Sequence, residues 1–558
     1  MTTFTGPPAD SEVGIGPLTL GGLLEDVAAR HADRDAVVFH SDGQVTRWTY
    51  RDLLEEARRV ARALIAHGVV KGTRVAVLMG NRPEFVAAAF GVAMAGGVIV
   101  PVSTYIEQPE LDYILRHSDA AVLLTQERLL AHEYVAALTN LCPDLLDAAP
   151  GALRSARFPF LRVVSVIGLR ESMGAIVPAD TFLADAADIS DELLDACARE
   201  VTPADDAVII YTSGTTARPK GVLHAQRAPA LQSWRLGQQL CLDPDVRVWT
   251  AFPFFWTAGF SMGMGATLAT GGCLVLQEHF DAGETLRLLE VERVTTPLAK
   301  AHQFAQLEDH PDWAKRNLSA LRHVEAFTSF GRHPSVHVDD VWSNRSAYGL
   351  TETMSSLASA PADTPAEVRT GNYGWILPGN TIRILDPATG EPLGVNAEGE
   401  ITVKGLTLAK GYVKTPVEEV FDADGYFHTG DSGFVDEEGR LHFTGRASQM
   451  IKTGGANVSP IEIEQELLRH PEIRMVWVVG VPDPARDELV VACVVPHDGA
   501  ALDENDIRTY LRGRIASYKI PRRTFFFAEE DLAMTGNNAK PQADVLRKLV
   551  TERMDAAT

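Results

Sequence analysis

One segment of the sequence combines the residue types that bind phosphate groups. The buried-type run Val208-Ile209-Ile210 leads into Tyr211-Thr212-Ser213-Gly214-Thr215-Thr216-Ala217-Arg218-Pro219-Lys220-Gly221. Glycine lets the backbone approach an anion closely, and successive N–H groups can form a phosphate-binding concavity. The hydroxyls add hydrogen-bond donors and Lys220 adds a positive charge. The order of residues is not that of a Walker loop. A polar surface turn is the alternative interpretation, which the length of the pattern disfavours.

This loop resembles the phosphate loop of the adenylate-forming superfamily, which includes acyl-CoA synthetases, adenylation domains and beetle luciferases. The family loop reads Tyr-Thr-Ser-Gly-Thr-Thr-Gly-x-Pro-Lys-Gly, from which the chain departs at Ala217. Other family motifs follow in the family's order and extend the resemblance over nearly the whole chain. They are Tyr348-Gly349-Leu350-Thr351-Glu352, Tyr426-Phe427-His428-Thr429-Gly430-Asp431, Gly445-Arg446, and Met450-Ile451-Lys452-Thr453-Gly454-Gly455.

The resemblance implies a role for each residue of the central motifs. Tyr348, beside Gly349, would present a flat face to adenine, and Thr351 would contact the α-phosphate. Glu352 would be a hard oxygen ligand for Mg²⁺ that bridges phosphates. Asp431 would offer two acceptor oxygens to the ribose hydroxyls, and Arg446 would reach ribose or phosphate. Alone, each of these residue types is more common in a turn, in a helix cap, in the core or on the surface.

The C-terminal motifs resemble the parts of a mobile lid. Lys452, Gly454 and Gly455 would approach a thiol tunnel after the lid rotates. The family hinge is usually aspartate or lysine, but here it is Ser448. The family's catalytic lysine maps to Lys540 because a leucine follows six residues later, although Ala539 replaces the usual glycine. An ammonium there would stabilise charge that builds up during adenylation. The alternative is a solvated tail lysine.

Aromatic residues mark a candidate pocket for the acid. The resemblance places Trp256 and Phe260 in its wall. It adds Phe330 from residues 327–331, the segment at the end of the strand expected at 324–327. Gly331 would lie on the adenine side. The glycines of Met262-Gly263-Met264-Gly265 would leave room if they face this pocket. Aromatic residues at such spacing are more often core residues than ligand contacts.

The elements that must position these residues alternate between strand and helix. A helical pattern opens at Thr49-Tyr50 and closes at Gly68, with a strand at residues 75–78, a helix at 84–95 and a strand from Val98. Further strands are expected at residues 120–124, 208–211, 273–276 and 324–327. This alternation predicts an α/β fold with stacked, mostly parallel sheets.

From about Gly374 the pattern changes to short strands separated by turns, which predicts a small β subdomain at residues 374–446. Beyond Arg446, an acidic helix, two strands and a second helix form an α+β pattern. We therefore expect a large N-terminal domain at residues 1–446 and a small mobile α+β domain at 447–558.

The overall composition excludes several classes of protein. The chain has 558 residues, 46% of them apolar, and a net charge of −23, which disfavours nucleic-acid binding. Its five cysteines are scattered, so neither a disulfide framework nor a zinc site is expected. Residues 85–102 lack polar side chains, but the Gly96-Gly97 break favours a buried helix and strand over a membrane span. We expect a cytoplasmic protein with no signal peptide, and homodimer formation is left open.

The resemblance thus implies an acid–thiol ligase that uses ATP, Mg²⁺ and coenzyme A. It would convert a carboxylic acid to acyl-AMP, release pyrophosphate and pass the acyl group to CoA. Transfer to a carrier-protein pantetheine or an amine, or no transfer, remains an alternative, as does a non-catalytic nucleotide-binding regulator. The chain lacks the Gly-x-Gly-x-x-Gly signature of a redox enzyme with a Rossmann fold, which argues against that class. A bulky aryl, alicyclic or medium-chain acid is the expected substrate.

Overall fold

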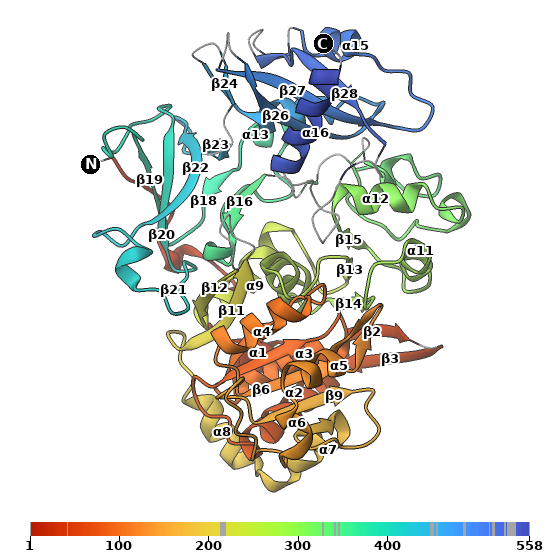
Figure 1. The fold of residues 1–558 in the computed structure, drawn as a ribbon, viewed down its shortest axis with the longest axis vertical. Coiled ribbons are helices and arrows are strands. Elements are labelled where there is room, and N and C mark those ends of the chain that lie inside the picture. The colour runs from red at the N-terminus through yellow and green to blue at the C-terminus, as the bar shows by residue number, and fades with distance from the viewer. Residues whose placement is uncertain are drawn as a thin grey trace.

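The computed structural model describes residues 2–41, 43–212, 219–325, 328–339, 342–343, 346–446, 451–453, 456–483, 487–512, 514–515, 519–528, 532 and 543–556. Within these ranges the chain forms stacked α/β layers, a β-rich subdomain and a small C-terminal α+β domain (Figure 1). This arrangement confirms the fold class that the sequence predicts.

The larger α/β sheet has eight strands and carries the start of the predicted phosphate loop. Its strands are parallel from β10 to β11, whereas β11–β12 and β12–β21 pair antiparallel. Three of the six parallel strands are buried along their whole length and the other three are partly exposed only at their ends, as expected for a sheet covered on both faces. The order is β10 (Ile176–Pro178), β9 (Val163–Ile167), β6 (Val122–Gln126), β4 (Arg74–Leu78), β5 (Val98–Pro101), β11 (Asp206–Thr212), β12 (Lys220–Ala225) and β21 (Gly411–Tyr412).

A second sheet of five strands shares one apolar core with the first. Its order is β15 (Thr296–Leu298), β13 (Arg247–Thr250), β14 (Cys273–Leu276), β2 (Asp35–Ser41) and β3 (Gln44–Thr49). The shared core is filled by α1 (Leu20–His31), α2 (Tyr50–Ala66), α3 (Pro83–Met94), α7 (Ala179–Ala184), α8 (Asp191–Arg199), α9 (Arg227–Gln239) and α10 (Ala266–Ala269). The outer faces pack against α4 (Gln108–His117), α5 (Tyr134–Leu141) and α6 (Asp144–Asp147) on one side, and α11 (Ala282–Val291) and α12 (Ala301–Glu308) on the other.

Local signals account for two of the inner helices. Thr49 caps α2: its hydroxyl accepts from the Asp52 N–H, and the Asp52 carboxylate accepts from the Thr49 N–H. In α3 every residue except Glu84 is buried, and β5 follows within a few residues. The long apolar segment is therefore a buried helix and strand, as predicted. Among the described residues no helix has both the length and the apolarity to span a membrane.

The β-rich part of the chain contains two antiparallel sheets. The larger sheet runs β1 (Phe4–Thr5), β19 (Asn380–Leu385), β20 (Gly399–Gly405), β22 (Phe427–Val435) and β23 (Leu441–Arg446). A three-stranded sheet of β16 (Ala347–Leu350), β17 (Ser355–Ser359) and β18 (Trp375–Ile376) lies between it and the α/β layers (Figure 1), and α13 (Ala366–Arg369) follows β17. The expected strand at residues 324–327 is wrong in its described part, where Val324 makes only an isolated bridge to Val338.

The C-terminal domain is built around a sheet of its own. The strands are β25 (Ala456–Val458), β24 (Ile451–Thr453), β27 (Asp487–Pro496), β26 (Ile473–Asp483) and β28 (Arg523–Phe526). Apolar side chains of α14 (Pro460–Leu467) and α15 (Glu504–Leu511) fill one core, and those of α16 (Ala543–Ala556) fill a second. A separate two-stranded sheet, β7 (Arg128–Leu129) and β8 (His132–Glu133), follows β6, and its Leu129 is buried in the core on the outer face of the large sheet.

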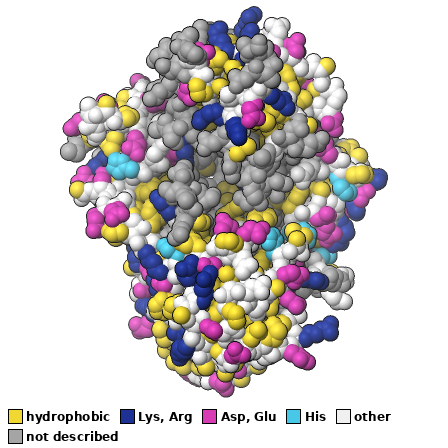
Figure 2. Space-filling view, in the orientation of Figure 1, with side chains coloured by type: hydrophobic (Ala, Val, Ile, Leu, Met, Phe, Trp, Pro, Cys, Tyr) yellow, Lys and Arg dark blue, Asp and Glu magenta, His cyan; other side chains and the backbone are white. Residues whose placement is uncertain are grey.

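Charged side chains of both signs are interspersed over the lower α/β part of the face shown in Figure 2. That mixture is typical of a well-solvated surface. It indicates that the net charge of −23 is not concentrated in this part of the surface.

Candidate functional site

A cavity of about 750 Å³ lies where the large α/β sheet meets the two β sheets of the subdomain. Its size is within the range of small-molecule sites. The cavity brings together eight of the residues predicted from the sequence, namely Thr212, Lys220, Tyr348, Gly349, Thr351, Glu352, Asp431 and Arg446. These residues come from five strands and one turn, so only the folded chain assembles them.

Several predicted site residues lie outside the described residues. They are Ser213, Gly214, Thr215, Thr216, Ala217, Ser448, Gly454, Gly455, Ala539 and Lys540. Lys452 belongs to β24, but the structure does not describe its side chain. Their assignments stay predictions.

The two strands that flank the phosphate loop fix where it begins and ends. β11 and β12 are antiparallel neighbours, and Thr212 at the end of β11 pairs with Lys220 at the start of β12. Thr212 and Lys220, on either side of the predicted loop, are therefore adjacent, and both border the cavity. The Lys220 ammonium lies 4.9 Å from the ring centroid of Tyr412, within the range of a cation–π contact.

Asp431 is held by two neighbours at the other side of the cavity. Tyr348 donates its hydroxyl to Asp431 Oδ2 at 2.8 Å, and Arg446 donates Nε–H to Oδ1 at 3.2 Å. Asp431 and Arg446 are cross-strand partners of β22 and β23, which explains their proximity. Each carboxylate oxygen keeps a further lone pair for an incoming hydroxyl.

Burial dominates the electrostatics of this cluster. It raises the pKa of the Asp431 carboxyl above its ordinary value, and the hydrogen bonds from Tyr348 and Arg446 offset this only in part. Burial, followed by the charge of Asp431, raises the pKa of Tyr348 well above its ordinary value. Tyr348 therefore remains a hydrogen-bond donor at neutral pH.

Aromatic rings form an apolar wall beside Asp431. The Tyr348 ring centroid lies 5.5 Å from that of Phe443 and 6.5 Å from that of Tyr373, and all three rings border the cavity. A flat apolar wall next to a carboxylate that has free lone pairs for hydroxyl donors suits a nucleoside. Sequence reasoning found Tyr348 but missed Tyr373 and Phe443, which carry no motif of their own.

Glu352 projects into the cavity from a short 3₁₀ turn at Thr351–Thr353. Tyr412 donates its hydroxyl to Glu352 Oε1 at 2.7 Å, and the Ala409 N–H donates to the Glu352 carbonyl at 2.7 Å. Sequence reasoning missed Tyr412. The only signal in the sequence is the pair Gly411-Tyr412, and a tyrosine after a glycine does not by itself predict a site. In the structure Gly411 has a positive φ.

The oxygen atoms that this cavity offers suit a metal cation that is bound mainly by the phosphate groups of a substrate. Among the described residues no group of three His, Cys, Asp or Glu side chains could hold a metal ion. Glu352 offers one carboxylate oxygen that has no hydrogen-bond partner in the described part of the chain. Mg²⁺ is usually bound by one or two carboxylates together with substrate phosphates, so a single carboxylate beside a phosphate loop fits it.

The predicted acid-pocket residues lie outside this cavity. Trp256 is half-buried, with its ring centroid 5.1 Å from that of Phe255 and 5.1 Å from the Lys300 ammonium. Phe260 belongs to the shared α/β core, and Phe330 packs against Phe304 and Trp313. Gly331 lies in the 3₁₀ turn Phe330–Arg332. Phe327 is outside the described residues, so the wall itself stays a prediction.

The glycines near Trp256 serve close packing rather than an open pocket. They lie on the π-helix Ala258–Gly265. A Cβ on Gly259 would be 2.0 Å from the Pro253 carbonyl oxygen, and one on Gly265 would be 2.2 Å from Ser233 Oγ. The expectation that Gly263 and Gly265 leave room in a pocket is therefore wrong, since Gly263 faces Thr250 and Gly265 faces Ser233.

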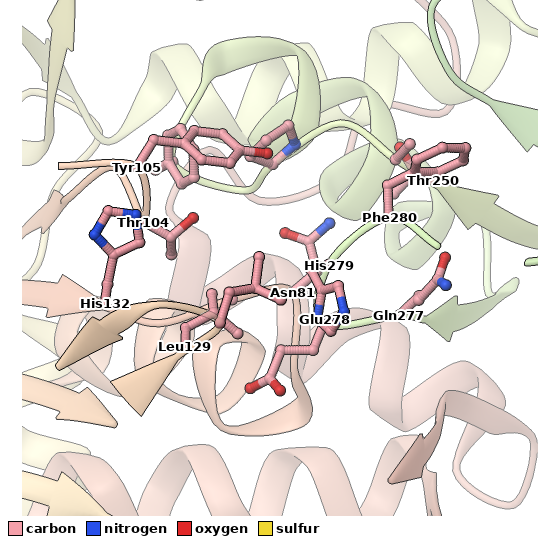
Figure 3. Close-up of a pocket in the computed structure, with 15 residues that line it drawn as sticks. Asn81, Thr104, Tyr105, Leu129, His132, Thr250, Gln277, Glu278, His279 and Phe280 are labelled. Carbon is pink, nitrogen blue, oxygen red and sulfur yellow. The ribbon is translucent and has the colours of Figure 1, made fainter. Parts of the chain in front are cut away.

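A second cavity lies between the two α/β sheets (Figure 3). Tyr105 and His132 border it on one side, and Gln277 and Phe280 border it on the other. Its volume of about 40 Å³ has room for a few water molecules rather than an organic acid. Asn81 and Glu278 in its lining already bind protein groups, Asn81 the backbone of residues 252 and 254 and Glu278 Arg82. We assign it no ligand.

Comparisons with known proteins agree with this geometry. Residues 24–413 match the sequence model of the AMP-binding enzyme family, and residues 462–538 match that of the AMP-binding enzyme C-terminal domain. A feruloyl-CoA synthase of an Amycolatopsis species is 32% identical, with 90% of this chain and 94% of the relative covered. The indoleacetate–CoA ligase of Aromatoleum aromaticum is also 32% identical, with the same coverage of 90% and 94%.

The crystal structure of ATP-bound MatB from Rhodopseudomonas palustris has the same fold. It aligns with a TM-score of 0.75 at 27% identity and covers 96% of this chain and 99% of MatB. The match to the family model spans most of the chain, from the first core helix through the phosphate loop, the Glu352 turn and Tyr412. The chain belongs to the AMP-binding enzyme family.

Proposed function

We propose that this enzyme joins a carboxylic acid to coenzyme A in two steps with ATP as the energy source. The observation that carries the proposal is the cavity that unites Lys220, Glu352 and Asp431 beside an aromatic wall. Relatives of nearly the same length are CoA ligases and synthases by name, which supports CoA as the acceptor.

In the first step a carboxylate oxygen of the acid attacks the α-phosphorus of ATP. The bond from that phosphorus to the bridging oxygen breaks, pyrophosphate leaves, and acyl-AMP remains. In the second step the thiolate of CoA attacks the acyl carbon, and AMP leaves with the carbon–oxygen bonding pair. Both steps conserve charge and electrons without a redox partner.

The residues of the cavity bind and orient the nucleotide. Asp431 accepts hydrogen bonds from the ribose hydroxyls, the Tyr348–Phe443 wall borders the adenine, and Lys220 and Arg446 attract phosphate charge. Glu352 would bind Mg²⁺, which when present neutralises phosphate charge and orients the leaving group. Thr351, adjacent to Glu352, would contact the α-phosphate.

The C-terminal domain would supply a different lysine to each step. By resemblance, Lys540 stabilises the charge of adenylation, and Lys452 with Gly454 and Gly455 serves thiol transfer. This division assumes that the domain changes its position about Ser448 between the steps. The domain boundary near Arg446 follows from the same assumption, since the β23 strand ends there.

We infer that the acid is bulky and aryl, with alicyclic and medium-chain acids as further members of the panel. The names of the feruloyl-CoA synthase and the indoleacetate–CoA ligase support an aryl acid, and so does an indole at Trp256 beside the expected pocket. We further propose a cytoplasmic enzyme, which the absence of disulfides among its five free cysteines supports, and a homodimer as the assembly to be tested by light scattering.

An acid panel tests the proposal directly. The enzyme is incubated with ATP, Mg²⁺ and each acid, with and without CoA, and pyrophosphate exchange and thioester formation are measured separately. We expect acid-dependent exchange without CoA and thioester with CoA. Exchange without thioester would favour a carrier protein or an amine as acceptor. No exchange with any acid would favour the non-catalytic regulator.

A further inference from the structure

The turn that carries Thr351 and Glu352 is held by three other elements at once. The carbonyl of Thr351 is 2.8 Å from His224 Nε2, and the carbonyl of Glu352 accepts from Ala409 N at 2.7 Å. The carbonyl of Thr353 accepts from Gln232 Nε2 at 3.0 Å. Three successive carbonyls thus bind three donors: one from β12, one from the segment before β21 and one from α9. Such over-determination is expected where a functional side chain must be held still.

The chemistry of His224 fits a dedicated donor. The ring is fully buried, and because a carbonyl only accepts, Nε2 must carry the proton. Nδ1 has no hydrogen-bond partner in the described part of the chain. Burial lowers the pKa of His224 to about 4, so the ring is neutral near pH 7. A leucine would fill a similar volume without leaving a buried nitrogen unpaired, so retaining histidine here indicates a use for its N–H.

Tyr412 acts on the carboxylate of the same turn. Its hydroxyl binds Glu352 Oε1, while the Lys220 ammonium lies over its ring face. Tyr412 therefore contacts a cation through its ring and an anion through its hydroxyl. Only one carboxylate oxygen of Glu352 is engaged, and the second has no partner among the described residues.

Strand β12 relates these contacts to one another. Lys220 begins the strand, His224 follows four residues later, and Val222 between them pairs with Tyr412 of β21. The phosphate-binding lysine, the donor beneath the turn and the tyrosine on the carboxylate therefore share one rigid pair of strands. A displacement of the Glu352 turn relative to Lys220 would break at least one of these contacts.

We propose that His224 and Tyr412 are positioning residues that hold the Thr351–Glu352 turn and present the second oxygen of Glu352 to a divalent cation on a bound nucleotide. The inference rests on the proposed function, because it assigns Thr351 and Glu352 to MgATP. His224 acts through the backbone of the turn, and Tyr412 acts through the carboxylate. We therefore expect the ATP affinities of the His224 and Tyr412 variants to respond differently to removal of the cation.

The experiment measures ATP binding to the full-length enzyme by calorimetry, once with Mg²⁺ and once with EDTA. The variants are His224→Leu, which removes the donor, His224→Gln, whose amide nitrogen can take the place of Nε2, and Tyr412→Phe, which keeps the ring. Thr125→Val is the control: Thr125 is fully buried in β6 of the same sheet and donates to the Leu78 carbonyl at 2.9 Å.

We expect His224→Leu to weaken binding roughly three- to tenfold with or without Mg²⁺, as the loss of one net hydrogen bond implies. His224→Gln should recover most of the affinity. Tyr412→Phe should weaken binding by a similar factor with Mg²⁺ but less than twofold in EDTA. Thr125→Val should lower the melting temperature and leave both dissociation constants unchanged.

Two results would overturn the inference. A folded His224→Leu variant that binds MgATP within twofold of the wild type would leave His224 without a positioning role. Equal losses for Tyr412→Phe with and without Mg²⁺ would show that Tyr412 does not act through the carboxylate. If the wild-type enzyme itself fails to bind MgATP, the proposed function fails instead, so the two failures are distinguishable.

Discussion

The buried carboxylate of Asp431, which we propose binds a ligand, lowers the stability of the folded protein when it is ionised. Its carboxylate is nearly fully buried, and burial raises its pKa although Tyr348 and Arg446 both donate to it. A raised folded-state pKa means that the folded protein binds this proton more tightly than the unfolded chain does. The ionised carboxylate therefore lowers stability at neutral pH, and that loss decreases as the pH falls through the folded-state pKa. Such a cost is expected where a charge must be ready for a ligand.

The first prediction concerns Asp431→Asn. The amide keeps an oxygen for Tyr348 but removes the buried charge, so the melting temperature at pH 7.5 should stay equal or rise. Any gain over the wild type should shrink as the pH is lowered, as the sign of the pKa shift requires. The KM for ATP should rise, since a hydrogen bond to a charged group contributes about 1.5–3 kcal/mol. A lower melting temperature with an unchanged KM would contradict both parts.

The second prediction concerns Trp256, whose half-buried indole lies between Phe255 and the Lys300 ammonium. Trp256→Ala removes a large side chain and should shift the acid preference toward wider acids, measured as kcat/KM across the panel. Trp375→Ala is the matched control, because Trp375 is 37% exposed on β18 and should leave the preference unchanged. An identical acid profile in Trp256→Ala and the wild type would make Trp256 a core residue.

At the scale of elements, the α/β layers contain a π-helix at Ala258–Gly265. Such helices are rare and occur frequently at functional sites. Its glycines let it lie directly against neighbouring backbone, since a Cβ on Gly259 would reach the carbonyl of Pro253 at 2.0 Å. The segment that carries Trp256 is therefore anchored to this helix by contacts that only glycine permits.

The third prediction tests that anchoring. Gly259→Ala should lower the free energy of unfolding by about 1–3 kcal/mol, as is typical of overpacking. It should also lower kcat/KM for the acid more than for ATP. Gly394→Ala is the control, because a Cβ there would meet no atom within 4 Å, and its effect should stay within about 0.5 kcal/mol. Urea unfolding measures both, and equal stability of the two variants would refute the packing argument.

Elements with local signals could be predicted from the sequence, and contacts between distant elements could not. The cap of α2 at Thr49 and Asp52 and the burial of α3 follow from residue types a few positions apart. The Tyr412–Glu352 and His224–Thr351 contacts join residues 60 and 127 positions apart. Nothing in a single sequence relates such positions unless both carry a motif, and neither Tyr412 nor His224 does.

The expected strand at residues 324–327 illustrates the opposite error. Its apolar pattern predicts a strand, but in the described part of the segment Val324 makes only an isolated bridge to Val338. A short apolar run does not determine whether a partner strand is available. The resemblance assigns Trp256, Phe260 and Phe330 to the acid pocket. Phe260 and Phe330 are buried, whereas Trp256 is half-buried, and their place in the pocket wall stays a prediction.

At the scale of the whole molecule, polar contacts join the C-terminal domain to the rest of the chain. Gln465 of α14 donates to the Tyr373 hydroxyl at 3.0 Å, and Arg474 of β26 forms an ion pair with Asp309 at 2.9 Å. Tyr373 also borders the cavity of about 750 Å³, so the domain reaches the wall of that cavity. A hydrogen bond and a partly exposed ion pair contribute little net stability, which is compatible with the proposed change of position of this domain.

The fourth prediction separates the two steps through the lysines of this domain. Removal of one preorganised charge stabiliser typically lowers a rate by about 10²–10³. Lys540→Ala should therefore suppress acid-dependent pyrophosphate exchange by about that factor, yet convert presynthesised acyl-AMP and CoA to thioester at a nearly normal rate. Lys452→Ala should show the reverse bias. Ser448→Pro, which restricts one backbone torsion, should spare adenylation and block transfer.

The three variants together decide whether the domain works in two positions. A domain fixed in one position would bring Lys540 and Lys452 to the same reaction geometry, and each substitution would then slow both steps alike. Circular dichroism and the melting temperature establish that the variants are folded before rates are compared. Equal slowing of both steps by a folded Lys540→Ala variant would leave Lys540 as a structural lysine. Opposite biases in Lys540→Ala and Lys452→Ala, with transfer alone lost in Ser448→Pro, require two positions of one domain.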